Sequence, residues 1–280
     1  MTTRSRGRAP TVTVAGALHR DTTPAVPTDD TLAVEAPLEL VVGGETLAVL
    51  LRTPTGPDDD VALALGFLLA EGIIDDARDV LAAAPCADPA AAAPENRVVV
   101  TLADGVPAPS SRRRFVSGSS CGLCGVDALA GLLDDLPPRP PDALALAARD
   151  LHGGPDGLAA RVRPHQPLFV ATGGVHAAAL FRGDALLDVR EDIGRHNAVD
   201  KLIGRRLRAG HMPAFDTFIW VSGRASFELV QKALRAGVGG LVAVGAPSAL
   251  AVEVARAHGL VLAGFARDDR ATVYSGRVAS

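Results

Sequence analysis

Short apolar runs alternate with stretches of helical periodicity over residues 168–280. Strands are expected where apolar residues follow one another without interruption, and helices where they recur every three or four positions. The expected strands are 168–172, 175–181, 185–189, 215–221, 241–244 and 260–263, and the expected helices are 199–207, 227–234 and 250–257. This alternation predicts a mixed sheet covered by helices, in an α/β (α+β mixed-sheet) fold.

Residues 29–110 predict a smaller N-terminal α/β lobe. Strands are expected at 32–34, 38–42 and 46–50, the last two joined by the Gly43-Gly44 turn. A helix is expected next, because an acidic capping cluster precedes a broad apolar face that ends at Gly72. After a loop rich in alanine and proline at 83–96, residues 97–102 are expected to return as a strand.

Two further segments have less regular patterns. Residues 1–28 are rich in threonine, proline and arginine without sustained periodicity, which predicts a disordered arm. Residues 111–167 predict a cysteine loop followed by a helical connector, with helices expected at 126–136 and 142–151. Four parts are therefore expected along the chain, in the order arm, N-terminal lobe, cysteine loop with connector, and C-terminal lobe.

Composition and charge narrow the class of protein. The 280-residue chain has a formal net charge of −4, which disfavours electrostatic binding to nucleic acid or to a membrane surface. No apolar run has the length of a signal peptide or a membrane span. The three cysteines are too few for a disulfide-built secreted domain, so a cytoplasmic protein is expected.

Cys121 and Cys124 are the first candidates for chemistry. They stand between glycines, after a serine- and glycine-rich run and near three arginines, where a helix is expected to begin. A helix N-terminus and nearby cations both favour the thiolate, which is the reactive form of cysteine. Half of a zinc site and an inert core pair are the alternatives. Zinc would need two further ligands, and no second C-x-x-C or H-x-x-x-H is present.

The stretch Glu191–Lys201 is dense in polar residues at the start of an expected helix. One interpretation is a helix capped by Asp192 whose charges are solvated. The other is a binding site that includes Arg195 and His196, since Gly194 would allow a ligand to approach the helix start. His176, alone on an apolar strand, is expected to be structural.

A second polar segment follows the last expected strand, at the edge where open α/β sheets place ligands. Arg267 and Arg270 could meet phosphates, Asp268 or Asp269 could accept hydrogen bonds from a guanine edge, and Phe265 could stack on a base. An ordinary charged surface turn is the alternative. The segment reads Phe265-Ala266-Arg267-Asp268-Asp269-Arg270.

Several motifs together resemble the formate dehydrogenase accessory sulfurtransferase (FdhD) family. The resemblance covers about residues 31–274, and the cysteine loop is its most specific part. The motifs are Arg114-Phe-Val-Ser-Gly-Ser-Ser-Cys-Gly-Leu-Cys-Gly125, Glu35-Ala-Pro-Leu38, Ala64–Ile74, Thr172-Gly-Gly-Val-His176, Glu191–Lys201 and Ser222-Gly-Arg-Ala-Ser-Phe-Glu-Leu-Val-Gln-Lys232.

The resemblance implies a function and partners. A cysteine desulfurase would donate sulfur as a persulfide on Cys121, with Cys124 assisting. The acceptor would be the molybdenum or tungsten cofactor of formate dehydrogenase, a bis(molybdopterin guanine dinucleotide). The resemblance also implies a homodimer, a cytidine-deaminase-like C-terminal lobe, and cofactor binding by the segment Phe265–Arg270. Relatives commonly carry proline and glycine where this chain has Asp268 and Asp269.

Three rival functions follow from the same features. A zinc deaminase needs H-x-E and P-C-x-x-C, but the corresponding helices carry His196-Asn-Ala198 and Ser222-Gly-Arg-Ala-Ser226, so no bound metal is expected. A non-catalytic cofactor chaperone with the cysteines as a clasp stays open. A thioredoxin-like oxidoreductase is disfavoured, because its C-x-x-C should follow a strand of an early β-α-β unit.

Overall fold

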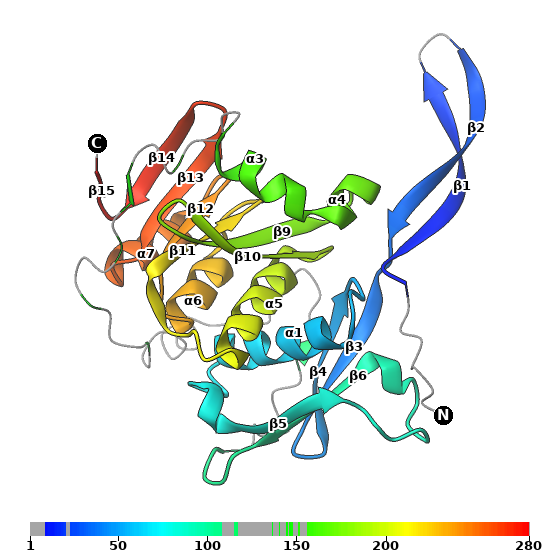
Figure 1. Ribbon diagram of the computed structural model, residues 1–280, viewed down its shortest axis with the longest axis horizontal. Coiled ribbons are helices and arrows are strands. Elements are labelled where there is room, and N and C mark those ends of the chain that lie inside the picture. Colours follow the sequence, from blue (N-terminus) through cyan, green and yellow to red (C-terminus); the bar gives the residue numbers. More distant parts are fainter. Residues whose placement is uncertain are drawn as a thin grey trace.

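The computed structural model describes residues 9–20, 23–107, 115–116, 136, 140, 144, 146–147, 151 and 156–279. The mixed α/β class predicted from the sequence is confirmed in these residues (Figure 1). A larger C-terminal sheet, a smaller N-terminal sheet and a projecting hairpin are its main parts. Likeness to a cytidine deaminase stays a prediction.

The C-terminal sheet has six strands in the order β10-β9-β11-β12-β13-β14. Its three central strands β11, β12 and β13 are parallel, while β9, β10 and β14 run antiparallel to their neighbours. The strands are β9 (His176–Arg182), β10 (Ala185–Asp192), β11 (Ala214–Val221), β12 (Val238–Ala243), β13 (Val261–Arg267) and β14 (Arg270–Ser275). Parallel central strands bring their carboxyl ends to one edge of the sheet.

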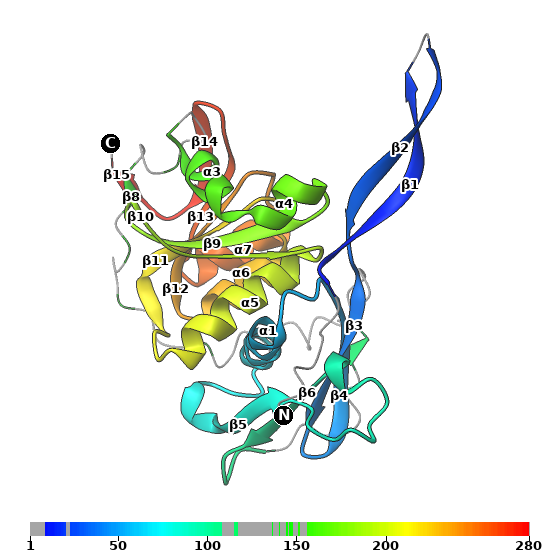
Figure 2. The ribbon, with the colours of Figure 1, turned by 45° about the vertical axis from the view of Figure 1, so that its right-hand side comes forward.

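Helices cover both faces of this sheet (Figure 2). Successive strand residues point to opposite faces, so β11 sends Ile219 to one core and Trp220 to the other. One face packs against α5 (Arg195–Arg208), α6 (Phe227–Arg235) and α7 (Ala249–Ala257), and the opposite face lies under α3 (Leu158–Val162) and α4 (Pro167–Thr172). The sheet is therefore the middle of three layers.

The N-terminal sheet has the order β5-β6-β3-β4-β7. Along β3 the side chains of Leu38 and Leu40 are buried while the intervening ones are more exposed, so one face of this sheet is apolar. The helix α1 (Pro57–Ala70) covers that face and packs against α5 on its other side. The strands are β3 (Ala36–Val42), β4 (Glu45–Arg52), β5 (Val80–Pro85), β6 (Arg97–Leu102) and β7 (Phe115–Val116).

Short elements complete the described chain. The strands β8 (Leu146–Ala147) and β15 (Val278–Ala279) pair in parallel near the C-terminus. Single 3-10 turns lie at η1 (Ala77–Asp79), η2 (Pro94–Asn96) and η4 (Arg163–His165). None of the described helices is both long enough and apolar enough to cross a membrane.

The prediction of a disordered arm over residues 1–28 is wrong for the part that the structure describes. Residues 11–20 and 23–33 pair as antiparallel strands, β1 (Thr11–Arg20) and β2 (Thr23–Ala33). Valine and threonine alternate in β1, which is a strand pattern, and the prolines that argued against order lie in β2. Proline is compatible with an edge strand, because its missing N–H faces away from the partner strand. Residues 1–8 lie outside the described part.

Two elements expected in the connector and the C-terminal lobe differ from the sequence prediction. Residues 168–172 were expected as a strand but belong to α4, which begins with Pro167 and ends before left-handed Gly173. The N–H groups of Leu168 and Phe169 donate to the Glu191 carboxylate at 3.0 and 2.8 Å, which supplies this helix start with acceptors. In the segment 142–151, expected to be helical, Leu146 and Ala147 form a strand.

Most other expected elements are confirmed, with bounds that differ by a few residues: β3, β4, β6 and α1 in the N-terminal lobe and β9 to β13 with α5 to α7 in the C-terminal lobe. The strands β5 and β14 were not expected. Both lie at sheet edges, where exposed positions weaken the apolar pattern. The lobe boundaries and the helix expected at 126–136 stay predictions, since most of that helix lies outside the described residues.

Candidate functional site

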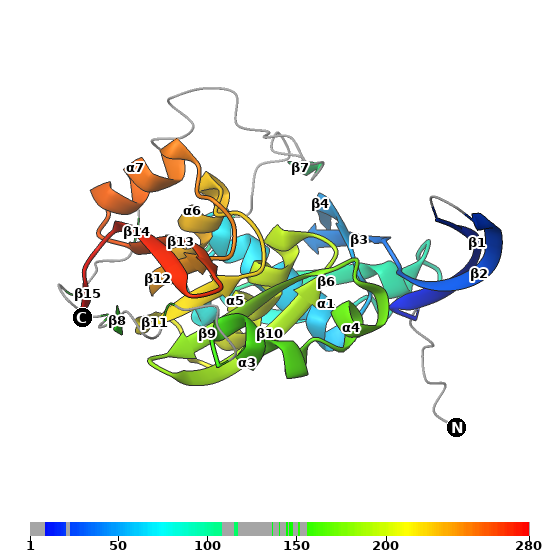
Figure 3. The same ribbon diagram turned by 90° about the horizontal axis from the view of Figure 1, so that it is seen from above.

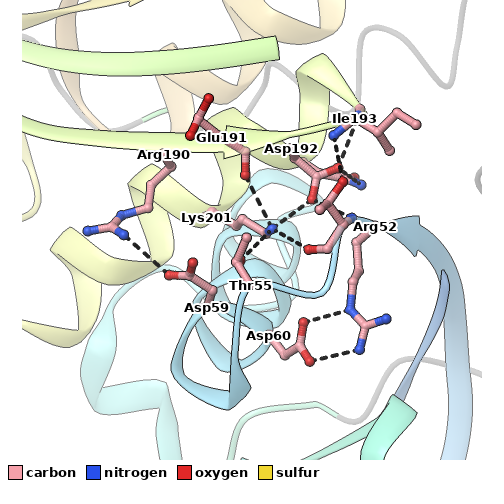
Figure 4. Close-up of polar contacts among 12 residues, drawn as sticks. Arg52, Thr55, Asp59, Asp60, Arg190, Glu191, Asp192, Ile193 and Lys201 are labelled. Carbon is pink, nitrogen blue, oxygen red and sulfur yellow. Dashed lines mark hydrogen bonds and ion pairs between the residues drawn. The ribbon is translucent and has the colours of Figure 1, made fainter. Parts of the chain in front are cut away.

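The polar stretch Glu191–Lys201, which ends β10 and begins α5, contains two groups of side chains that face different parts of the molecule. Asp192 and Lys201 face the N-terminal lobe, and both side chains are 0% exposed. Lys201 Nζ lies 2.7 Å from Asp192 Oδ2 and donates to the Thr53 carbonyl at 3.0 Å and to Thr55 Oγ1 at 3.1 Å (Figure 4). The Thr53 N–H in turn donates to Asp192 Oδ2 at 3.0 Å. The interpretation that these two charges are solvated is therefore wrong, because they join the two lobes.

Arg195 and His196 project from the first turn of α5 toward the carboxyl end of β11. There they meet residues that are distant in sequence. We call the group the edge cluster, and its members are His176, Arg195, His196, Ser222, Ser226 and Glu228. His176 begins β9, Ser222 follows β11, and Ser226 and Glu228 lie at the start of α6.

Two histidine contacts organise the edge cluster. His176 Nδ1 lies 3.3 Å from Ser222 Oγ, which also accepts a hydrogen bond from the Ala177 N–H at 3.0 Å. His196 Nε2 lies 2.8 Å from Glu228 Oε2 and 3.3 Å from Ser226 Oγ. The α5 and α6 helices are thereby tied together at their N-terminal ends.

The surroundings lower the pKa of two members of the cluster, His176 and Glu228. For the histidine this favours the neutral form, and for the glutamate it favours the charged form. Burial lowers the pKa of His176, and the positive charge of Arg195 lowers it further, so both favour a neutral imidazole. The hydrogen bond from His196 is the main cause that lowers the pKa of Glu228, which favours its carboxylate. A neutral histidine thus stands beside Arg195, while His196 lies against a carboxylate.

The edge cluster lies where two helix N-termini converge. The N-caps of α5 and α6 are Gly194 and Ser226, and among the described residues no side chain caps the first N–H groups of either helix. Uncapped N–H groups and the helix dipole together favour an anion. Arg195 Nε is buried and lacks a hydrogen-bond partner among the described residues. The chemistry of the cluster therefore suits a phosphate or another anion.

Gly223 keeps space open between the basic members. A methyl group at this position would lie 3.4 Å from His176 Cε1 and 3.9 Å from Arg195 Cδ. This places Gly223 in contact with both residues, directly after β11. Glycine leaves its backbone accessible to a ligand that approaches these side chains.

The second predicted segment, Phe265–Arg270, lies at the same edge of the sheet. The Phe265 N–H donates to the Gly245 carbonyl at 3.1 Å, and the Gly245 N–H donates to the Gly223 carbonyl at 2.9 Å. These two bonds connect Phe265 through the end of β12 to the edge cluster. The sequence places the two candidate stretches about 70 residues apart, and the parallel strands bring them to one edge.

The residues of the segment Phe265–Arg270 differ in how exposed their side chains are to a ligand. The side chain of Ala266 is buried in the core beneath α3, so only its backbone can reach a ligand. Phe265 is partly exposed and has a left-handed backbone with φ of 52°. Asp268 is also left-handed and turns the chain into β14, which was not expected from the sequence. The four residues Arg267, Asp268, Asp269 and Arg270 are exposed.

Sequence reasoning missed three members of the edge cluster: Ser222, Ser226 and Glu228. In the sequence, the motif that contains them stands out for its resemblance to the FdhD family and for its lack of the zinc ligands of a deaminase. Ser226 and Glu228 join the cluster because α6 packs beside α5, which brings them into contact with His196, 30 and 32 positions earlier in the chain. Two serines and an acidic residue around a helix start, paired with a His-containing helix start, were the available signal.

Cys121 and Cys124, the predicted catalytic residues, lie outside the described residues. The strand β7, Phe115–Val116, ends shortly before them and pairs in parallel with β4 (Figure 3). The third cysteine, Cys86, follows β5 and donates its N–H to the Arg97 carbonyl at 2.8 Å. Within the described part of the chain, no three His, Cys, Asp or Glu side chains are grouped so as to hold a metal ion.

Comparison with known proteins supplies the context for this geometry. The model of the FdhD/NarQ family matches residues 33–279. A Nocardia farcinica protein named sulfur carrier protein FdhD is 45% identical over 278 residues, which cover 97% of this chain and 93% of the relative. A protein of the same name from Mycobacterium tuberculosis is 46% identical over 255 residues, covering 88% and 90%.

A solved structure shares the fold. It is the crystal structure of a protein described as a formate dehydrogenase accessory protein from Desulfotalea psychrophila. The two chains superpose with a TM-score of 0.72 at 22% identity, and the match covers 95% of this chain and 97% of the other. At this identity the likeness supports the architecture alone.

Proposed function

The chain belongs to the FdhD/NarQ family, and on this premise we propose that it is a sulfur carrier that serves formate dehydrogenase. Sulfur would be taken from a cysteine desulfurase as a persulfide on Cys121. It would then be passed to a molybdenum cofactor of the bis(molybdopterin guanine dinucleotide) type, which is the substrate of the transfer. The names of the relatives support the sulfur-carrier role. The desulfurase as donor, the molybdenum cofactor as acceptor and Cys121 as carrier are proposed here.

The transfer needs two thiol steps, which are the loading of Cys121 and the reductive release of its outer sulfur. The Cys121 thiolate attacks the terminal sulfur of the desulfurase persulfide, forms a new S–S bond, and releases the desulfurase thiolate. For release, the Cys124 thiolate would attack the Cys121 sulfur, form a Cys121–Cys124 disulfide, and free the outer sulfur as hydrosulfide, which the cofactor binds; an external thiol would then reduce the disulfide. Glycine and serine neighbours and nearby arginines favour access and ionisation of such a thiol. Cys124 would assist by attacking the persulfide or by protecting Cys121 as a disulfide.

The observation that carries the cofactor half of the proposal is the edge cluster. A dinucleotide cofactor presents diphosphates. The cluster offers two helix N-termini and the buried Nε of Arg195, for which the described part of the chain supplies neither side-chain caps nor a hydrogen-bond partner. At the same sheet edge, Phe265 could stack on guanine while Asp268 or Asp269 accepts from its N1 and N2 donors. Glu228 does not oppose an anion strongly, because His196 is paired with it.

Replacing Arg195 by alanine is expected to weaken GDP binding about tenfold, because one charge-assisted contact to phosphate is lost. The affinities of wild type and variant would be measured by titration calorimetry at fixed salt. Arg182→Ala is the matched control, since Arg182 forms an exposed pair with Asp216 away from the cluster. It should bind GDP like the wild type.

The contact between the guanine base and Asp268 or Asp269 is tested separately, by comparing the affinities for GDP and ADP. Wild type should prefer GDP over ADP, and replacing both Asp268 and Asp269 by alanine should reduce that preference. Equal loss of affinity in the Arg195 and Arg182 variants, or absence of GDP binding in the wild type, would show that the cofactor docks elsewhere on the protein. Sulfur loading of Cys121 would still be open to measurement in that case.

A further inference from the structure

His176 differs from a histidine that only fills the core. Successive residues of β9 point to opposite faces of the sheet, so His176 shares with Ala178 the face that α5 and α6 cover. His176 is nevertheless partly exposed, whereas Ala177 and Ala178 are buried. The strand therefore places this ring at the rim of the helical layer, where α5 and α6 begin.

One nitrogen of the His176 ring is held by a serine. Nδ1 lies 3.3 Å from Ser222 Oγ, and the same oxygen accepts a hydrogen bond from the Ala177 N–H at 3.0 Å. The serine hydroxyl has one proton to donate, and among the described residues its acceptor is His176 Nδ1. Donation to Nδ1 places the proton of a neutral imidazole on Nε2. Ser222 therefore holds the ring by one nitrogen and makes the other a donor.

The second nitrogen, Nε2, has no hydrogen-bond partner in the part of the chain that the structure describes. It is bonded to Cε1, which would lie 3.4 Å from a methyl group placed on Gly223. Arg195 Cδ would lie 3.9 Å from the same methyl group. Because glycine carries no side chain, the imidazole and the arginine border one space directly after β11. A ligand in that space can meet the Nε2–H and the guanidinium together.

The charges around the ring keep it neutral. Burial is the main cause that lowers the pKa of His176 below its ordinary value of 6.5, and the charges of Arg195 and His196 lower it further. Asp192, the residue opposite on β10, acts in the other direction. Its carboxylate is paired with Lys201 at 2.7 Å, so it is not available to hold a proton on the ring. On α6, the carboxylate of Glu228 is likewise paired with His196.

We propose that His176 binds the cofactor, by donating its Nε2–H to a phosphate oxygen beside Arg195, and that Ser222 is the positioning residue that fixes this tautomer. The inference rests on the proposed binding of a guanine dinucleotide at the edge cluster, and it names the groups that meet the diphosphate. It also revises the expectation that His176 is only structural. Arg195 supplies the charge and His176 supplies a directed neutral donor, which suits a group with several neighbouring oxygens.

Two amide substitutions separate a ligand-binding role from a structural one. The side-chain amide of asparagine stands near the place of Nδ1, and that of glutamine, which is one carbon longer, near the place of Nε2. His176→Asn should keep a polar contact with Ser222 but lose the donor to phosphate, so its affinity for GDP should fall about tenfold. His176→Gln should keep that donor and stay within about threefold of the wild type. Titration calorimetry at fixed salt measures both.

The neutral state and the tautomer are measured separately. Between about pH 7.5 and 8.5 the affinity for GDP should change less than about twofold, because His176 is neutral throughout. An imidazolium donor would instead lose about tenfold over that pH unit as it deprotonates. Nitrogen-15 NMR of the free protein should show the Nε2–H tautomer, in a signal that disappears in His176→Asn. Ser222→Ala should convert this signal to a mixture of tautomers, which a change in stability alone would not do.

The outcomes distinguish this inference from the proposed function. Wild-type binding of GDP with equal affinity in His176→Asn, or weaker binding by His176→Gln than by His176→Asn, would overturn the role of His176 and leave the cofactor site standing. An Nδ1–H tautomer in the free protein would overturn the role of Ser222. If His176→Asn is unfolded in a urea titration, the glutamine variant and the NMR signal still decide. Absence of GDP binding by the wild type would overturn the cofactor half of the proposed function, and this inference with it.

Discussion

Gly204→Ala is expected to destabilise the protein by about 3 kcal/mol or more, because α5 and α1 cross with their backbones in contact. A methyl group at Gly204 would lie 1.9 Å from the Ala62 carbonyl oxygen. Likewise, a methyl group at Gly66 on α1 would lie 2.0 Å from the Asp200 carbonyl oxygen on α5. Backbone atoms in mid-helix cannot move aside as a flexible side chain can, so the helices must separate.

The effect opposes the local preference of the helix. In an isolated helix, alanine would be favoured over glycine by up to about 1 kcal/mol. Destabilisation would therefore report the close crossing and not helix propensity. Urea unfolding followed by circular dichroism gives the free energies of unfolding.

Gly174→Ala is the matched control for Gly204→Ala. Its nearest atom would be 3.7 Å away and it does not need a left-handed backbone, so its effect should stay within about 0.5 kcal/mol. If Gly204→Ala unfolds at the same urea concentration as Gly174→Ala, the helices do not approach as closely as the structure describes. The positioning of the α5 start, and with it Arg195 and His196, would then need another explanation.

Lys201→Met is expected to cost about 3–5 kcal/mol, since it leaves Asp192 as an uncompensated buried charge. Lys201 also loses its contacts to Thr53 and Thr55, which hold the chain just before α1. Both lobes should loosen together, because this group of contacts joins β4 and its following loop to the start of α5. Thermal and urea unfolding of the full chain would measure the loss.

Arg208→Ala provides the comparison for Lys201→Met. Arg208 pairs with Asp58 on the surface, where the two side chains are 54% and 92% exposed. Pairs of this kind contribute about 1 kcal/mol or less. A double replacement of Lys201 and Asp192 by apolar residues should recover part of the stability, because the unpaired charge is removed. Equal effects of Lys201→Met and Arg208→Ala would contradict the joining role of the buried pair.

The sequence predicted elements well where local pattern and tertiary environment agree. Buried strands such as β11 and β12 are continuous apolar runs, which makes them recognisable without knowledge of the fold. The segment 168–172 was mistaken for such a strand. Its helix depends on the Glu191 carboxylate, which lies more than 20 positions away and accepts the N–H groups of Leu168 and Phe169.

The hairpin β1–β2 was missed for a different reason. Both of its strands are largely exposed, so burial does not enforce a clear apolar pattern, and the prolines of β2 suggested disorder. The order comes from pairing between the two strands, and the valine–threonine alternation at the start of β1 is the only strand signal in its sequence.

Only some residues of the candidate site could be identified from the sequence. Arg195 and His196 were identified from their position at a helix start, and they do lie in the edge cluster. Ser222 and Ser226 gain their roles from contacts with the two histidines across the fold, which a linear reading does not contain. The backbone bonds from Phe265 to Gly245 and onward to Gly223 likewise depend on the sheet register.

The central claim is that Cys121 carries sulfur, and intact mass spectrometry tests it most directly. Wild type and single cysteine variants would be incubated with a cysteine desulfurase and cysteine, desalted, and measured with and without reductant. Cys86→Ala is the control, because Cys86 lies after β5 in the N-terminal lobe and has no part in the proposed transfer. The account predicts one added sulfur atom, removed by reductant, in wild type and Cys86→Ala, and none in Cys121→Ala. Full loading of Cys121→Ala, or no loading of the wild type, would contradict it.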